Sequence, residues 1–267
     1  MLSLLIICLI AGGVGAILQG MIGIGTGIII IPLLTFLLPN YGIPQSIAVH
    51  MALATSLAAI VLNSLSALIS HHKRGNVQWA LFKKIIIFSL FGSFAGAFLA
   101  SFISGYYLER IFGVFMISLA SYMFLKKSAI DQSNIIPSPS LRTIITGGFS
   151  IGFVGSVIGT GGGALMIPFL HTLKVKMRHA IGTTTLICLP VAAIGAITYI
   201  FTGLSKVPLS VPSLGYLYWP ALLAISASGT ICAPLGARLA SVLPANILKN
   251  LFAACMVLVG LKMMTGV

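Results

Sequence analysis

The stretch Gly23-Ile24-Gly25-Thr26-Gly27 is followed by an apolar run that ends at Pro32, and the chain contains a second copy of this pattern. The copy is Gly159-Thr160-Gly161-Gly162-Gly163, followed by an apolar run that ends at Pro168. Each glycine stretch interrupts a segment apolar enough to cross a bilayer, and glycine there frees backbone groups that lipid cannot satisfy. Paired interruptions in two halves of a chain are typical of a transporter binding site.

Composition places the chain in a membrane. Its 267 residues are 58% hydrophobic and 6% charged, and Glu109 and Asp131 are the acidic ones. A soluble domain carries about 25% charged residues, so the lipid bilayer is the expected surroundings. The net charge of +13 comes from short basic clusters between apolar runs, which is where topogenic signals lie, so nucleic acid is not an expected partner.

Hydrophobic segments of about 20 residues can cross a bilayer as helices. The sequence predicts such segments over residues 2–19, 46–70, 81–103, 108–125, 141–158, 180–201, 217–243 and 247–264. A shorter apolar run, 28–38 or 164–170, follows each glycine break and predicts either a half-helix or a thin, tilted span. The expected fold is an all-α polytopic membrane protein with about 8 to 10 membrane elements.

The two halves of the chain are repeats of each other. Besides the glycine breaks, His50-Met-Ala-Leu-Ala-Thr-Ser56 matches Arg178-His-Ala-Ile-Gly-Thr-Thr184, and Trp79 matches Trp219. We therefore expect a first membrane repeat over 1–125, a cytoplasmic linker over 126–140 and a second membrane repeat over 141–267. The linker contains the Pro-Ser-Pro-Ser stretch at 137–140.

Charge predicts that the repeats have inverted topology. The loop after the glycine segment is uncharged in the first half, but in the second half it carries Lys174, Lys176 and Arg178. Placing this loop, the linker and the loop around Lys73 in the cytoplasm puts twelve of the fifteen Lys and Arg there. This arrangement predicts a multi-pass membrane protein with both termini outside.

The glycine breaks are also the predicted substrate site. The first turn of a helix has unpaired N–H groups and a partial positive charge, and it binds anions. In inverted repeats the two short helices enter from opposite sides, so their N-termini meet and form one pocket for a small anion. The residues that we expect to line it are Gly23, Gly25, Thr26, Gly27, Gly159, Thr160, Gly161, Gly162 and Gly163. The alternative is that the glycines only let helices pack closely.

Hydroxyl, amide and imidazole groups follow at helical spacing. His50, Thr55, Ser56 and Asn63 lie on the second long segment, and Thr183 and Thr184 occupy the matching place in the other half. We count all six as candidate substrate-binding residues, although serine and threonine often bond to their own helix. An ionisable residue in a membrane suggests a pathway or gating role, which we expect for His50.

The sequence also lacks several kinds of site. Carriers of protons or sodium commonly use buried carboxylates, so coupling here would depend on His50 or on backbone carbonyls, or would be absent. The four cysteines have no paired spacing, and neither a metal site nor a cofactor is predicted. No nucleotide-binding or catalytic pattern is present, so an enzyme is not expected and no catalytic residue is assigned.

These motifs resemble the sulfite exporter TauE/SafE family of membrane permeases. The resemblance rests on Gly159-Thr-Gly-Gly-Gly-Ala-Leu-Met-Ile-Pro168, Ala180-Ile-Gly-Thr-Thr184, Ala54-Thr-Ser-Leu57 and Gly75-Asn-Val-Gln-Trp79. It implies an inner-membrane transporter of small sulfur-containing anions, such as sulfite or organosulfonates. It also implicates the glycines of both breaks together with Thr55, Ser56, Thr183 and Thr184. In the first half Thr26 stands where the second half has Gly162.

Two other functions are left open by the residues. The chain is either a permease for another solute, such as a metal ion or a thiolated compound, or a non-transporting membrane scaffold subunit. A homodimer is a further expectation, because duplicated membrane proteins often leave a flat outer face for pairing.

Overall fold

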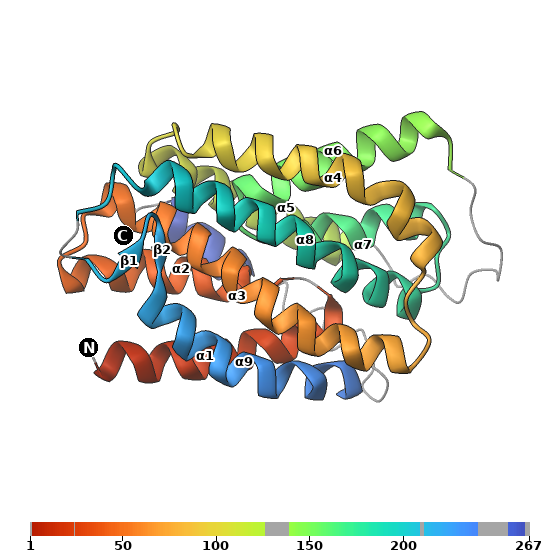
Figure 1. Cartoon of the computed structure of the whole chain (residues 1–267), viewed down its shortest axis with the longest axis horizontal. Coiled ribbons are helices and arrows are strands. Elements are labelled where there is room, and N and C mark those ends of the chain that lie inside the picture. The colour runs from red at the N-terminus through yellow and green to blue at the C-terminus, as the bar shows by residue number, and fades with distance from the viewer. Residues whose placement is uncertain (1, 24, 126–138, 209–210, 240–255, 265–267) are drawn as a thin grey trace.

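A computed structural model describes residues 2–23, 25–125, 139–208, 211–239 and 256–264. The bundle is helical, as Figure 1 shows. The first half contains α1 (Leu2–Ile22), α2 (Gly27–Leu37), the 3-10 helix η1 (Leu38–Tyr41), α3 (Gln45–Lys73), α4 (Trp79–Ala100) and α5 (Gly105–Leu125). The second half contains α6 (Leu141–Val157), α7 (Gly163–Thr172), α8 (Met177–Gly203) and α9 (Trp219–Leu239), and residues 256–264 are also helical.

Five of these helices are long and apolar enough to cross a membrane: α1, α3, α4, α8 and α9. The helices α6 and α7, and α2 together with η1, are apolar but shorter. The chain is therefore an all-α polytopic membrane protein. The expected half-helices begin directly after the glycine breaks, at Gly27 and Gly163, as the backbone freedom of glycine suggests.

The helices pack in pairs that each combine the two halves. α1 packs along α9, α4 packs along α6, and α3 lies against α8. Glycines bring the backbones together: a Cβ on Gly152 of α6 would overlap the Ser89 carbonyl of α4, and one on Gly236 of α9 would overlap the Ile17 carbonyl of α1. Small residues of this kind replace hydrophobic burial as the basis of helix packing in lipid.

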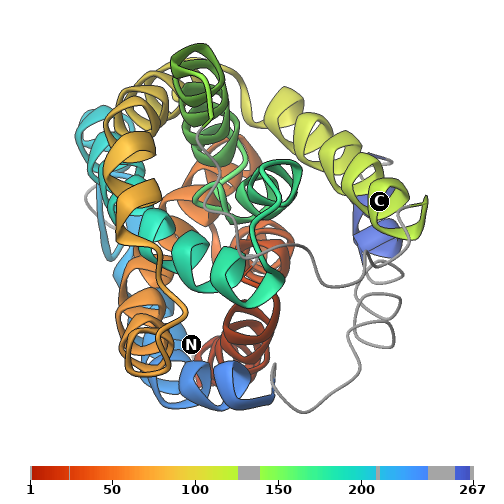
Figure 2. The same cartoon turned by 90° about the vertical axis from the view of Figure 1, so that its right-hand side faces the viewer.

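The end-on view of Figure 2 places α5 at the edge of the bundle, beside the helix of residues 256–264. A Cβ on Gly113 of α5 would lie 2.8 Å from the Gly260 carbonyl, so these two helices also pack closely. The linker over 126–140 was expected between the halves, and its residues 126–138 lie outside the described part of the chain. The same holds for residues 240–255 of the predicted segments 217–243 and 247–264.

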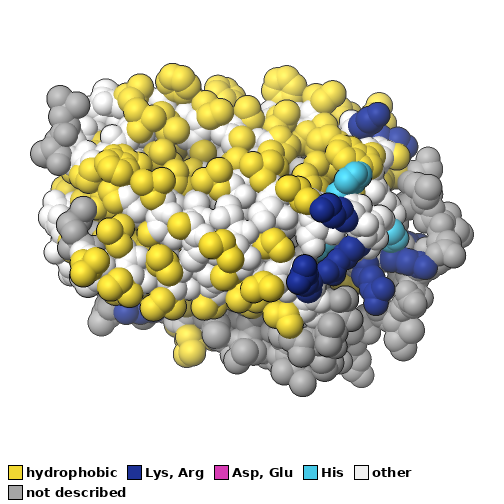
Figure 3. Space-filling view, turned by 60° about the horizontal axis from the view of Figure 1, so that its bottom comes forward, with side chains coloured by type: hydrophobic (Ala, Val, Ile, Leu, Met, Phe, Trp, Pro, Cys, Tyr) yellow, Lys and Arg dark blue, Asp and Glu magenta, His cyan; other side chains and the backbone are white. Residues whose placement is uncertain are grey.

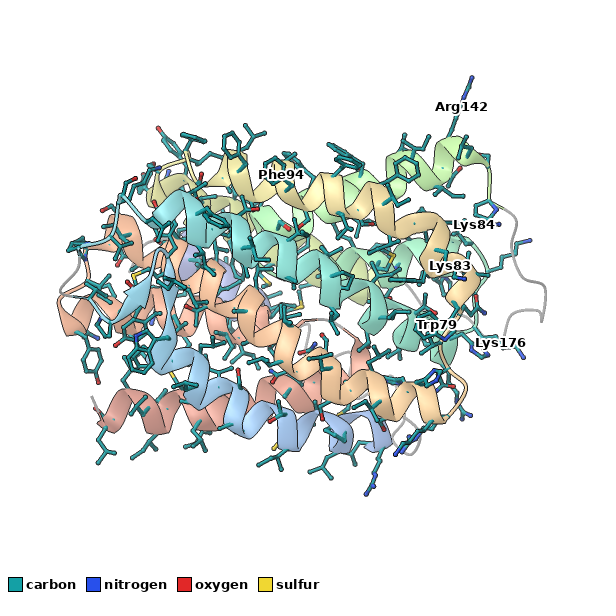
Figure 4. All side chains as sticks on the ribbon, in the orientation of Figure 1. Trp79, Lys83, Lys84, Phe94, Arg142 and Lys176 are labelled. Carbon is teal, nitrogen blue, oxygen red and sulfur yellow. The ribbon has the colours of Figure 1, made fainter. Side chains whose placement is uncertain are left out.

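A short β-ribbon was not expected from the sequence. β1 (Ser213–Leu214) pairs antiparallel with β2 (Leu217–Tyr218), and α9 starts directly after β2 at Trp219. The turn between the strands crosses α8 so closely that a Cβ on Gly215 would overlap the Ile200 carbonyl. The ribbon lies at the opposite end of the bundle from Lys83, Lys84 and Lys176, as a comparison of Figures 1 and 4 shows.

Lysine and arginine gather at that other end of the molecule. Figure 3 shows most of the visible Lys and Arg side chains together with histidines at the right-hand end and a further one at the lower left, while apolar side chains are spread over the rest of the described face. In Figure 4, Trp79 lies at the same end and Phe94 points outward from the middle of α4. An apolar belt with tryptophan and basic residues at one end is the surface of a protein that sits in a bilayer.

Candidate functional site

The two glycine breaks are in direct contact inside the bundle. A Cβ on Gly27 would lie 2.6 Å from the Gly159 carbonyl oxygen, and a Cβ on Gly163 would lie 2.6 Å from the Gly23 carbonyl oxygen. A Cβ on Gly25 would come 2.5 Å from the carbonyl oxygen of Thr160. Because these neighbours are backbone atoms that cannot rotate away, the contact has room only for glycine. We call it the glycine contact.

The short helices start at the glycine contact and run in opposite directions. α2 leads through η1 to the start of α3, at the end of the bundle with the β-ribbon, whereas α7 leads to Lys176 at the basic end (Figures 1 and 4). The N–H groups of Gly27 and Ile28, and of Gly163 and Ala164, have no partner within their own helices because they lie in the first turn. Two positive helix ends therefore point at one place.

The two breaks differ in their backbone conformation. Gly159, Gly161 and Gly162 all have positive φ angles, of 71°, 64° and 80°, and Gly162 is the residue that precedes α7. Its counterpart Thr26 has a φ of −55° and a ψ of −15°, an ordinary right-handed helical conformation. A side chain is costly at positive φ, so threonine requires this different turn. The departure of Thr26 from the glycine pattern therefore alters the shape of one break.

Hydroxyl groups lie at the glycine contact and on the stretch of α8 from Ile181 to Cys188, whose side chains would meet Cβ atoms on Gly23 and Gly163. Ser56 donates a hydrogen bond of 3.0 Å from Oγ to the Gly159 carbonyl, and its Oγ would lie 2.7 Å from a Cβ on Gly27. Thr26 and Thr184 are buried, and their hydroxyls have no hydrogen-bond partner among the described residues. Unpaired buried hydroxyls are costly, and they are available to a ligand that enters here.

Thr55 and Thr183 each bond to a backbone N–H from the other half of the chain. The Thr55 hydroxyl accepts a 3.0 Å hydrogen bond from the backbone N–H of Tyr218, directly before α9. The Thr183 hydroxyl accepts one of 3.0 Å from the backbone N–H of Gln78, directly before α4. Each threonine thus holds the start of a helix from the other half, and the two bonds occupy matching places in the two halves.

His50 lies at the β-ribbon end of α3, where α4 ends, and belongs to a separate group of contacts. Its Nδ1 is 3.2 Å from the Ser46 carbonyl, and its Nε2 is 3.3 Å and 3.0 Å from the carbonyls of Ala100 and Ile103. The Tyr216 ring stacks on it with the ring centroids 4.9 Å apart. Burial raises the pKa of the Tyr216 phenol above its usual value, so this ring stays uncharged at neutral pH.

Asn63 also lies away from the glycine contact. Its amide packs on the backbone of α9 at Gly229, where a Cβ would overlap the Asn63 side chain. Ile60 lies one helical turn earlier on α3. Its side chain contacts both glycine breaks, because it would meet a Cβ on Gly25 or on Gly161. The candidate residues thus divide into the glycine contact with Ser56 and Thr184, the two helix-holding threonines, and the outlying His50 and Asn63.

Polar residues that the sequence did not single out form a bridge beside the contact. Ser93 of α4 shares a hydrogen bond of 2.7 Å with Ser156 of α6 and donates one of 2.7 Å to the Val191 carbonyl of α8. The Tyr199 hydroxyl donates to the Ser156 carbonyl at 3.3 Å. Isolated serines among glycines give little signal in a sequence, because serine is also a common small packing residue in membrane helices.

Carboxylates are far from the glycine contact in the described part of the chain. Glu109, on α5, is 7% exposed and accepts a 3.4 Å hydrogen bond from Gln45 at the start of α3, and Asp131 lies outside the described residues. The described residues also contain no group of three His, Cys, Asp or Glu that could hold a metal ion. The electrostatics near the contact therefore come from helix ends and hydroxyl groups.

Long apolar helices around two short ones that meet head to head inside the bundle define a polytopic membrane protein of the transporter class. The chain belongs to the sulfite exporter TauE/SafE family, whose family model matches residues 8–263. The family resemblance noted in the sequence is confirmed.

Similar proteins come from bacteria and archaea. A probable membrane transporter protein of Haemophilus influenzae is 32% identical over 98% of this chain and 99% of its own length. The probable membrane transporter protein MJ0441 of Methanocaldococcus jannaschii is 32% identical over 81% of this chain and 77% of its own, and YdhB of Bacillus subtilis is 31% identical over 88% and 89%. No solved structure gives a significant match. Family and relatives indicate a membrane transporter, and the relatives' names specify no solute.

Proposed function

We propose that the protein carries small sulfur-containing anions, such as sulfite or organosulfonates, across the cell inner membrane, as an exporter or facilitator. The observation that supports this proposal is the meeting of two positive helix ends at the glycine contact, far from any described carboxylate. An oxyanion needs several N–H and O–H donors, which Gly27, Gly163 and the unpaired hydroxyls of Thr26 and Thr184 supply. The backbones touch here, so the two breaks must separate to admit the anion.

We further propose that the halves, 1–125 and 141–267, are inverted-topology repeats. Three pairs of contacts support the inversion, because each exchanges matching residues of the two halves. Gly27 contacts Gly159, and Gly163 contacts Gly23 in the same way. Thr55 accepts the N–H of the residue before α9, and Thr183 accepts the N–H of the residue before α4. The packing of α1 on α9 corresponds to that of α6 on α4. An axis in the membrane plane then passes through the glycine contact, near mid-membrane.

The basic end of the bundle is the cytoplasmic side in this proposal, and both termini lie outside. Cysteine labelling tests the orientation, in a background with the native cysteines replaced by alanine. A membrane-impermeant maleimide is expected to label Asn40→Cys and Ser205→Cys in cells with intact inner membranes, because these exposed positions lie in outer loops. Lys73→Cys and Lys174→Cys are expected to react only after permeabilisation. Labelling of Asn40→Cys and Lys174→Cys from the same side would contradict the inversion.

Flux from proteoliposomes tests the substrate class. Vesicles containing the purified protein and loaded with radiolabelled sulfite, or with an organosulfonate, are expected to release it with saturable kinetics, while protein-free vesicles retain it. An imposed pH gradient shows whether protons are coupled. Release of a metal cation or a neutral thiol, with every sulfur oxyanion retained, would contradict the proposal.

A further inference from the structure

A second group of buried polar side chains lies about one helical turn from the glycine contact, where α1, α3 and α9 meet. It consists of Gln19 on α1, Asn63 and Ser64 on α3, and Ser226 on α9, and we call it the amide cluster. Gln19 donates from Nε2 to the Ser64 hydroxyl at 2.7 Å. Asn63, next to Ser64, packs on Gly229, and Ser226 lies one turn before that glycine.

The amide cluster has unfilled hydrogen-bonding capacity. Asn63 is 0% exposed, yet both atoms of its amide group have no partner among the described residues. The same is true of Gln19 Oε1 and of the Ser226 hydroxyl, in side chains 2% and 7% exposed. An unpaired buried amide is costly in a membrane protein, and a helix interface that needed only packing would have apolar residues here. The vacant hydrogen-bonding groups therefore point to a ligand.

The helix end beside the amide cluster favours positive charge. Gln19 lies in the last turn of α1, which ends at Ile22 where the first glycine break begins. The final carbonyls of a helix carry partial negative charge, and the Gln19 carbonyl accepts a 2.7 Å hydrogen bond from the N–H of Gly23. The C-terminal ends of broken membrane helices bind Na⁺ or H⁺ in transporters, while the N-terminal ends face anionic groups.

We propose that the amide cluster is a binding site for a monovalent cation of the size of sodium, with oxygen ligands from Gln19, Asn63, Ser64 and Ser226 and the carbonyl end of α1. The group is uncharged, and two positive charges would need carboxylates that it does not contain, so a divalent cation does not fit. A bound cation would lie about one helical turn from the glycine contact and would attract the anion there. Its role in coupling rests on the proposed transport function, but its binding does not.

Binding is tested without transport, through the thermal unfolding of the full-length protein in detergent. Sodium chloride is expected to raise the Tm above that in choline chloride of equal concentration, since a ligand that binds only the folded state stabilises it. Asn63→Ala is expected to abolish this sodium-dependent rise. Ser66→Ala is the matched control, because Ser66 lies at the same interface of α3 with α9 but its hydroxyl already donates to the Thr230 carbonyl, at 2.7 Å.

Asn63→Asp distinguishes a cation from other ligands, and it keeps the shape of the side chain if the alanine variant fails to fold. A carboxylate in place of the amide is expected to lower the half-saturating sodium concentration at least about tenfold. No sodium-specific rise in the wild-type protein would overturn the proposal. So would a rise that persists in Asn63→Ala, or a Tm that responds to sulfite and is weakened by Asn63→Asp, which would indicate an anion subsite.

Flux then tests coupling separately. An imposed sodium gradient is expected to change the rate of sulfite release from proteoliposomes, and Asn63→Ala is expected to remove that dependence. Sodium-dependent stabilisation without release of any sulfur oxyanion would contradict the proposed function and support the cation site. Sulfite release that does not depend on sodium, from a protein that sodium does not stabilise, would support the proposed function and contradict the cation site.

Discussion

Alanine at Gly27 or at Gly163 is expected to reduce anion flux at least about 100-fold, a loss typical of a displacement of about 1 Å at a reacting or binding centre. The added methyl carbon would lie 2.6 Å from a backbone carbonyl oxygen of the other break, which no rotamer change can relieve. The break must therefore move, and the helix end that we propose as half of the anion site moves with it. Flux per folded protein in proteoliposomes measures the effect.

Gly13→Ala is the matched control, since its added carbon would be 3.4 Å from Cys232 Sγ, an ordinary contact, and this glycine lies on α1 away from the breaks. Monodisperse gel filtration of each variant separates loss of flux from loss of fold. Normal flux in both Gly27→Ala and Gly163→Ala would show that the glycine contact is not the transport site. The glycines would then serve only to let the helices pack closely.

Valine at Thr55 or at Thr183 is expected to cost about 1–3 kcal/mol in the free energy of unfolding, because valine keeps the shape but leaves the N–H of Tyr218 or of Gln78 without a partner. The expected fall in Tm is roughly 2–10 °C for each variant. In inverted repeats the two bonds are equivalent, so the two losses should be similar. If the sites are independent, the double variant should show their sum. Thermal unfolding in detergent measures all three.

Thr185→Val is the control for these variants. Thr185 is buried on α8 two residues from Thr183, but its hydroxyl donates to the Ile181 carbonyl of its own helix, at 3.0 Å. That carbonyl keeps its helical partner when the hydroxyl is removed, so little stability is lost. A fall for Thr185→Val as large as that for Thr183→Val would mean that the loss comes from crowding and not from the unpaired N–H.

Long helices were the most predictable part of the fold. The predicted segment 46–70 corresponds to α3 (Gln45–Lys73) and 81–103 to α4 (Trp79–Ala100), because a bilayer demands a continuous apolar stretch of defined length. The starts of α2 and α7 followed from the glycines, which are the residues that permit the backbone to leave a helix there. The β-ribbon at 213–218 was missed because two residues per strand are too few for an alternating pattern.

Side-chain partners were much less predictable than helices. Helical spacing placed Thr55, Ser56 and Asn63 on one helix, but it could not say which neighbour each one faces. Ser56 reaches the other glycine break, Thr55 the start of α9, and Asn63 the backbone at Gly229. These differences depend on the packing of helices from the two halves, which sequence periodicity does not encode.

The pairing of α1 with α9 and of α4 with α6 restricts how such a protein can move. Each pair takes one helix from each half, and at Gly236 and Gly152 the paired backbones touch with no side chain between them. A rigid-body rotation of one half against the other would separate the helices of both pairs. In the proposed transport cycle we therefore expect each mixed pair to move as a unit, so that the moving parts would differ from the two halves of the sequence.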